Sequence, residues 1–326
     1  VKVMAKKIFF LVLFCLANSC SQNKNTTIIK LAHSLDVTHP VHKAMVYMSD
    51  RVKERSGGKM IVDIYPGGQL GNERELIELL QIGSLGMTKV STAPLEGFIP
   101  DMKIFGMPYL FENDEHRWSV LNGKIGRELL QSGESYFLRG MCYYDAGSRS
   151  FYTKDKPINT PSNLEGLKIR VQKSQTSINM VKSLGGAATP IPWGELYTSL
   201  QQGVVDGAEN NPPSFYLSKH YEVCKFLSLD EHTSIPDVLI MSTFVWNSLN
   251  KVEKNWLQTS IDESVDYQRN LWKIATQKAL KNIQDAGVTV IYPDKNSFQK
   301  LVQSMYENYR DEPFYRLIKQ IREMAI

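Results

Sequence analysis

Several short stretches of this 326-residue chain gather side chains that could do chemistry, and GVVDGAENNPPSF is the densest. Residues 203–215 place Glu209, Asn210 and Asn211 in a row directly before two prolines. Such a row could hold a catalytic acid, form a turn or hold a ligand. No nucleophile and no second placed acid accompany Glu209, so we interpret it as structural. Asn210 is the predicted ligand contact, Asn211 is a weaker candidate, and the prolines stiffen the segment around them.

The stretch HSLDVTHPVH concentrates four groups that could ligate a metal ion, namely His33, Asp36, His39 and His42. Their spacing matches no common zinc pattern, and Pro40 is expected to open a helix that carries His42. We therefore expect no metal site, and expect His33 to hydrogen-bond a polar ligand from a loop. The chain has no G-x-S-x-G elbow, Walker loop, G-x-G-x-x-G turn after a strand or C-x-x-C pair, so no cofactor is expected.

Two arginines are placed to bind an anion. In GLKIRVQ, apolar and polar residues alternate, which sets Arg170 on the polar face near a strand end. Ligands bind at strand ends in α/β sheets. The alternative for Arg170 is an exposed side chain whose stem covers apolar surface. Arg149 follows a Gly-Ser turn and could reach the same carboxylate, with a surface ion pair as its alternative.

These side chains need a framework, and the sequence alternates strands with helices from residue 26 onward. In the first half, strands are expected at 26–33, 59–66, 87–91, 137–144 and 149–153, with helices at 40–54, 72–83 and around 115–131. In the second half, GLKIRVQ is a strand, a helix runs from Ser174 to Gly185, AATPIP is a short strand and WGELYTSLQQG is a helix. One long helix is expected from Lys251 to about Ala286. This order predicts an α/β fold with mostly parallel sheet.

Composition and charge exclude one class of partner. The hydrophobic fraction of 42% is ordinary for a globular protein, and the length allows two cores. The formal net charge is +4, but Lys2, Lys6 and Lys7 lie in an acid-free start, so the remainder has 35 basic and 34 acidic residues. A nearly neutral body without a basic stripe argues against nucleic-acid binding.

The first twenty residues read as an export signal that ends at a cysteine. Residues 1–19 have a basic start, a short apolar run and small residues before Cys20, which is typical of a lipoprotein leader. Leucine stands four residues before the cysteine instead of the usual three, and a plain signal peptide is the alternative. Residues 20–27 then form a polar tether, with the lipid as the membrane attachment. The body's two cysteines, Cys142 and Cys224, lie in apolar contexts that favour buried free thiols, although sequence leaves their pairing open.

Long motifs give the chain a family resemblance. GGKMIVDIYPGGQLGNERELIELLQIGSLGMT, GLKIRVQKSQTSINMVKSLGGAATPIPWGELYTSLQQGVVDGAENNPPSF and KHYEVCKFLSLDEHTSIPDVLIMSTFVWNSL resemble the periplasmic substrate-binding proteins of TRAP transporters. The resemblance runs from about residue 28 to 310. It implies a protein that binds small organic acids and delivers them to a membrane permease, without enzymatic activity or cofactor, and we expect a monomer.

The same resemblance implies a periplasmic-binding-protein-like fold. Two α/β lobes would enclose a ligand cleft, and a long helix would span both. We assign residues 28–147 and about 236–275 to lobe I, and residues 148–235 and about 276–326 to lobe II.

The family's functional residues carry over to five positions. The carboxylate-gripping arginine falls on Arg170, the second arginine on Arg149 and the ligand-facing asparagine on Asn210. Trp193 matches an aromatic that closes over the ligand, and Glu73 matches a lobe I acid near ligand hydroxyls. On structural grounds alone, the indole of Trp193 could instead pack between helix and sheet, and the Glu73 carboxylate could simply serve a helix start.

The resemblance also favours one ligand class. DGAENNPPS with EHTSIPDVLIMS looks most like the branch that binds hexuronates such as glucuronate or galacturonate. Ser91, and Ser34 or His33, stand where sialic-acid binders have an acid and an asparagine, which puts sialic acid in doubt. C4-dicarboxylates are a further alternative ligand. An exported uronate lyase with His33 or His39 as base, and a binding protein that feeds a sensor, are the alternative functions.

Overall fold

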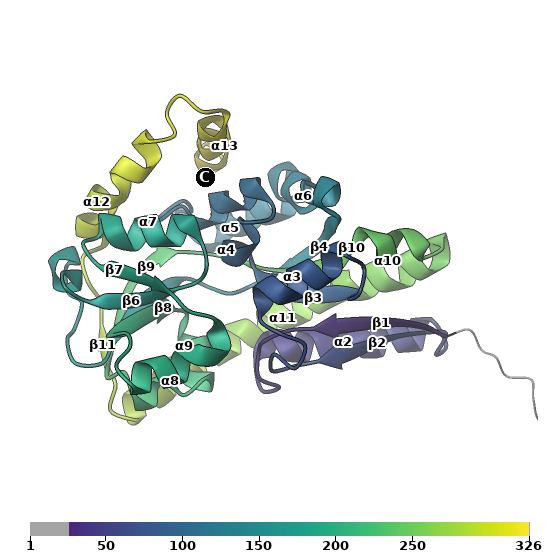
Figure 1. The fold of residues 1–326 in the computed structure, drawn as a ribbon, viewed down its shortest axis with the longest axis horizontal. Helices are drawn as coiled ribbons and strands as arrows, with labels where there is room; N and C mark the ends of the chain where they lie inside the picture. The colour runs from purple at the N-terminus through teal and green to yellow at the C-terminus, as the bar shows by residue number, and fades with distance from the viewer. Residues whose placement is uncertain (1–25, 326) are drawn as a thin grey trace, which may run out of the picture.

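The computed structural model describes residues 26–325, which form two mixed sheets flanked by helices (Figure 1). The first sheet has the order β2 (Met60–Tyr65), β1 (Thr27–Ala32), β3 (Met87–Ser91), β10 (Asp237–Ser242) and β4 (Leu138–Tyr144). The second has the order β11 (Thr289–Ile291), β9 (Phe226–Thr233), β5 (Arg149–Thr153), β8 (Gly207–Asn210), β6 (Lys168–Val171) and β7 (Ala187–Pro190). The α/β class is confirmed.

Five of the nine strand pairs among the described residues are parallel, so the expectation of mostly parallel sheet holds only narrowly. β10 runs antiparallel to both of its neighbours, β3 and β4, and β5 runs antiparallel to both β8 and β9. The antiparallel pairs arise because the chain crosses between the sheets, from β4 to β5 and back from β9 to β10. It crosses a third time along α11, before β11. Two of these crossing strands, β9 and β10, had no sequence-based assignment.

The helices follow the expected periodicity with one exception. The α-helices are α2 (Pro40–Arg55), α3 (Glu73–Gln81), α4 (Thr92–Leu95), α5 (Asp114–Asn122), α6 (Lys124–Gln131), α7 (Gln175–Ser183), α8 (Leu196–Gln201), α9 (Pro212–Leu217), α10 (Thr243–Ser248), α11 (Lys251–Asp285), α12 (Lys295–Glu307) and α13 (Pro313–Arg322). The single helix expected around 115–131 is two helices, because Gly123 between α5 and α6 has an extended backbone with ψ −171°. Short 3₁₀ turns include η1 (Pro100–Gly106) and η4 (Trp193–Glu195).

The expected long helix is present as α11, which has 35 residues and crosses from the first sheet to the second (Figure 1). It packs on α2 and β4 at one end and on α9 at the other. Its buried Gln268 accepts from the amide of Asp145 and donates to the carbonyl of Asp145, both at 2.8 Å. The helix is therefore fixed to the first crossing segment.

The first two crossing segments, from β4 to β5 and from β9 to β10, contact each other. Ser148 and Ser234 hydroxyls are 3.0 Å apart. Gly147 has φ +57°, and a Cβ there would lie 3.0 Å from Nε1 of Trp272, so this turn needs glycine. The exact division into lobes stays a prediction. α13 belongs to the part assigned to lobe II but packs on η1, which belongs to the part assigned to lobe I. In the same region, the ring of His116 lies 2.8 Å from the carbonyl of Ile321.

Cys142 and Cys224 are both buried and free, and they belong to different hydrophobic clusters. The leader at 1–19, Cys20 and the tether up to residue 25 lie outside the described residues. Among the helices of residues 26–325, none combines the length and the apolar character that a membrane span requires.

Candidate ligand-binding site

Two adjoining cavities lie between the sheets. The first encloses about 450 Å³, including space open to solvent, and the second about 1200 Å³. Ser34, Glu73, Gln172 and Trp193 line both, so the two cavities are parts of one cleft. Among the predicted ligand residues, the first cavity brings together Glu73, Arg149, Trp193, Asn210 and Asn211, and the second adds Arg170.

Arg149 enters the first cavity from the start of β5, but its guanidinium is already engaged. Its Nη2 donates to Oε1 of Glu209 at 2.8 Å, Nε donates to the other carboxylate oxygen, and Nη1 donates to Oδ1 of Asn210 at 2.9 Å. Burial alone would lower the pKa of Arg149, but Glu209 raises it above the ordinary value. Arg149 is therefore a neutralised cation that positions the end of β8.

A buried chain of charges continues behind this pair. Nδ1 of His232 lies 2.8 Å from Asp230, and its Nε2 lies 3.5 Å from Glu209. Burial lowers the pKa of His232, but Asp230 and Glu209 raise it to about 9. Burial raises the pKa of Glu209, but Arg149 and His232 lower it to about 2. Arg149 and His232 hold Glu209 in its charged form, in agreement with the structural interpretation of Glu209.

Asn210 ends β8, and Asn211 begins α9. Oδ1 of Asn210 accepts from Arg149 and from the amide of Asn211 at 2.9 Å, which leaves its amino group to donate elsewhere. Oδ1 of Asn211 accepts from the amide of Ser214 at 2.8 Å and caps the helix. The two prolines occupy the first positions of α9, where their missing N–H groups cost nothing.

Arg170 is the less satisfied arginine. It lies on β6 with an exposed fraction of 2%, and its Nε donates to the carbonyl of Ile191 at 2.8 Å. Its Nη1 is buried without a hydrogen-bond partner among the described residues. Burial lowers its pKa. An unpaired buried charge has a high free-energy cost, so a buried cation with a free donor favours the binding of an anion.

Trp193 lies beside this arginine at the start of η4. Its ring centroid is 5.7 Å from Cζ of Arg170, and it meets the His220 ring edge-on at 5.1 Å. The indole is only partly buried and lines both cavities. It therefore offers a flat apolar wall next to the free cation.

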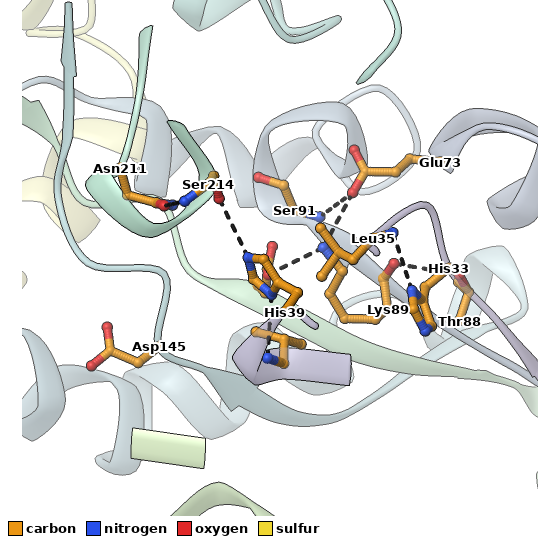
Figure 2. A network of polar contacts seen from close by, with 12 residues as sticks. His33, Leu35, His39, Glu73, Thr88, Lys89, Ser91, Asp145, Asn211 and Ser214 are labelled. Carbon is orange, nitrogen blue, oxygen red and sulfur yellow. Dashed lines mark hydrogen bonds and ion pairs between the residues drawn. The ribbon is translucent and has the colours of Figure 1, made fainter. Parts of the chain in front are cut away.

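The opposite wall comes from the first sheet (Figure 2). Lys89 on β3 is almost fully buried, and its Nζ lies 3.1 Å from Asp237 and 3.6 Å from Glu73. The amide of Ser91 donates to Oε1 of Glu73 at 3.0 Å. Asp237 opens β10 directly beside Ser91, because the two residues are register partners. We call Glu73, Lys89 and Asp237 the lysine cluster.

Comparison with known proteins adds a family to this geometry. Residues 31–312 match the bacterial extracellular solute-binding proteins of family 7. The chain belongs to this family. The solute-binding protein is 36% identical to the uncharacterized protein YiiZ of Salmonella typhimurium over 299 residues, which cover 91% of each chain.

Solved structures of TRAP periplasmic solute-binding proteins resemble this solute-binding protein closely. One from Xanthobacter autotrophicus, with bound β-D-galacturonate, has a TM-score of 0.88 and 37% identity, covering 90% of this chain and 99% of that chain. One from Anaerococcus prevotii, with bound D-glucuronate, has a TM-score of 0.88 and 36% identity, covering 91% and 99%. The expected TRAP family and two-lobed fold are thereby confirmed.

His33 does not line either cavity of the solute-binding protein. Its Nδ1 accepts from the amide of Leu35 at 3.1 Å, and its Nε2 lies 3.0 Å from Nδ1 of His42. His39 occupies the cavity wall instead, next to Trp272, and burial holds its pKa well below the ordinary value. Within residues 26–325, no group of three His, Cys, Asp or Glu side chains is placed to hold a metal ion.

Hydrogen bonds cross the cleft of the solute-binding protein. The hydroxyl of Ser91 donates to Gln172 at 3.2 Å. His39 lies 3.4 Å from the hydroxyl of Ser214 (Figure 2). The amide of Thr176, in the first turn of α7, donates to Glu96 of the first sheet's side at 3.1 Å. The two walls are therefore in direct contact.

Sequence reasoning missed several cavity residues. Lys89 and Asp237 had no assignment, and Gln172, Ser214 and Trp272 were not singled out. Lys89 carried a usable signal, since a lysine inside the strand MTKVS must either face solvent or find buried acids. Trp272 had no such signal in the sequence, because an aromatic residue on a long helix is normally expected to pack in the hydrophobic core.

Proposed function

We propose that the protein captures a hexuronate, such as glucuronate or galacturonate, and delivers it to a TRAP membrane permease by closure of the cleft. The observation that carries this proposal is the free, buried Nη1 of Arg170 beside Trp193. A uronate has one carboxylate for that cation and a ring whose C–H face can stack on the indole. The uronate-bound structures of relatives at 36–37% identity support the same ligand class.

The other walls of the cleft suit hydroxyl groups. The amino group of Asn210 can donate, the carboxylate of Glu73 can accept, and Asn211 is a further candidate contact through its amino group. Arg149 supports this surface by holding Asn210. Arg149, Arg170, Trp193 and Asn210 would close against Glu73 across the cleft, so binding and closure are one equilibrium.

We infer that the ligand leaves unchanged, so the protein is not an enzyme. A lyase would need a base close to the ligand, and His39 is the histidine that lines the first cavity. Nδ1 of His39 accepts from the amide of Val41, so its lone pair is occupied at the start of α2. Incubation with uronates and oligouronides should give no unsaturated or reducing product; their appearance would favour the lyase.

We place the protein in the periplasm as a monomer, with the lipid on Cys20 as its membrane attachment. The coarser statement, an extracellular solute-binding protein, follows from the family. Globomycin, which blocks lipoprotein signal peptidase, should cause a larger precursor to accumulate. A protein processed normally in its presence would carry a plain signal peptide.

The deciding experiment is a thermal-shift panel with galacturonate, glucuronate, N-acetylneuraminate, succinate and malate. A ligand at 100 times its dissociation constant adds about 2.7 kcal/mol of stability, which such a panel detects readily. We expect the uronates to raise the melting temperature most. A response to succinate or malate alone would overturn the substrate class, and uptake assays with and without the permease would separate transport from sensing.

A further inference from the structure

Two members of the lysine cluster, Lys89 and Asp237, line the first cavity only, whereas Arg170 lines the second cavity only, and Glu73 lines both. Glu73, Lys89 and Asp237 all line the first cavity, and the side chain of Lys89 is 3% exposed. Two carboxylates and one ammonium give the cluster a formal charge of −1; burial raises the pKa of Glu73, and the neighbouring ammonium of Lys89 opposes that shift. The cleft therefore has a cation, Arg170, in the second cavity, and a cluster of net negative formal charge that extends from Glu73 into the first cavity.

The second arginine does not change this polarity. The charge of Arg149 is neutralised by Glu209 through two side-chain hydrogen bonds. His39 also lines the first cavity, but burial keeps it neutral by lowering its pKa. A ligand that places a carboxylate on Arg170 thus presents its far end to a site with a net negative charge.

Glu73 and Lys89 of the lysine cluster keep capacity for a hydroxyl group. Oε1 of Glu73 accepts from the amide of Ser91, which leaves Oε2 free to accept from a hydroxyl. Lys89 donates one hydrogen to Asp237 and lies 3.6 Å from Glu73, so its ammonium keeps at least one hydrogen to donate to a ligand oxygen. A neutral polyol end satisfies both requirements, whereas a carboxylate would meet two like charges at short range.

We propose that the lysine cluster is the specificity-determining element of the cleft, because it accepts the hydroxyl-bearing end of a sugar acid and rejects a second carboxylate. This inference rests on the proposed function and narrows it to monocarboxylic sugar acids. Lys89 alone would attract a diacid. Asp237 and Glu73 cancel that attraction and reverse its sign.

The test compares two open-chain acids that differ only at the far end. Galactonate ends in CH₂OH and galactarate in a second carboxylate, and galacturonate serves as the reference ligand. Affinities are measured by calorimetry, or by competition against galacturonate. In the wild type we expect galactarate to bind at least about tenfold more weakly than galactonate, the ratio that about 1.4 kcal/mol produces.

Substitution of Asp237 reverses the selection. Asp237→Asn brings the cluster to zero charge and releases a hydrogen of Lys89, so galactarate should gain at least about tenfold relative to galactonate. Adding Lys89→Met to Asp237→Asn should abolish that gain. Asp285→Asn, an equal charge change at an exposed position on α11, is the matched control and should leave the ratio unchanged.

The outcomes separate the inference from the function on which it rests. Galactarate binding to the wild type as tightly as galactonate would overturn the inference while galacturonate binding still supported the function. Failure of galacturonate to bind would overturn the function and the inference with it. If neither open-chain acid competes in the wild type, Asp237→Asn decides: galactarate competition must then appear in it. Melting curves check folding, and Glu73→Gln, with the same charge change, replaces Asp237→Asn should that variant not fold.

Discussion

Arg149 and Glu209 form a two-pronged ion pair inside the second sheet, while the neighbouring Arg170 has no acidic partner within hydrogen-bonding distance among the described residues. Two arginines that look alike in sequence thus have different tasks. Arg149 holds the end of β8 in place, and Arg170 keeps a donor free for the ligand. This difference leads to opposite expectations for their substitution.

Arg170→Ala should abolish ligand binding without unfolding the protein. Charge-assisted hydrogen bonds contribute about 1.5–3 kcal/mol each, so the loss of two lowers affinity by about 100-fold or more. Only one internal bond, to Ile191, is lost, and the free energy of unfolding should fall by about 1 kcal/mol at most. Calorimetry with galacturonate and urea unfolding measure the two effects; undiminished affinity contradicts the assignment.

Glu209→Gln should chiefly destabilise the fold. Removal of one partner from a buried ion pair costs about 3–5 kcal/mol, because Arg149 is left charged and buried. Urea unfolding should show the loss in the absence of ligand. Glu222→Gln, at an exposed position where Glu222 accepts a hydrogen bond from Tyr197, is the control and should stay within about 1 kcal/mol of the wild type. Equal stability of the two variants would contradict the structural role of Glu209.

Stability should decrease as the pH rises from about 6.5 to 9. The pKa of His232 is raised to about 9 from 6.5, so its contribution is complete below pH 6.5 and is lost as the pH passes 9. The pKa of Glu209 is lowered, so its contribution is complete above pH 4.5 and is lost toward pH 2. His232→Gln should flatten the alkaline decrease in urea unfolding at pH 6 and 9. An unchanged slope would show that His232 is neutral in the folded protein.

Gln268→Ala should loosen the junction between α11 and the first crossing segment. The amide and the carbonyl of Asp145 would both lose their buried partner, at about 1–3 kcal/mol for each group that stays unsatisfied. Unfolding by urea gives the stability, and Gln258→Ala on the same helix is the control, since Gln258 is only partly buried. A Gln268 variant as stable as this control would show that the junction does not depend on the bond.

The sequence predicted those parts of the fold that local patterns determine. Alternation located β6 and hence Arg170, and the cap at Ser174 together with the glycines after it located α7. The lysine cluster was not predictable in this way, because Lys89 and Asp237 are 148 residues apart and meet only through the antiparallel pairing of β10 with β3.

The histidine prediction shows the same limit at short range. His33 and His39 lie in one loop, and sequence gave no means to decide which would face the cavity. The decision depends on the turn after β1, where the backbone of His33 pairs with Tyr65 and Gly68. Similarly, the sequence indicated that GAENN is functional. It did not indicate that the carboxylate of Glu209 would form an ion pair with Arg149.

The bond from Thr176 to Glu96 gives the cleft a built-in reporter. The amide of Thr176, in the first turn of α7, donates to Glu96 on the opposite wall, so this amide becomes exposed to water when the two walls separate. The hydrogen–deuterium exchange rate of this amide then follows the fraction of molecules whose cleft is open, and no attached probe is needed. Saturating ligand should slow this single amide, while the amides deeper in α7, bonded within the helix, exchange as before.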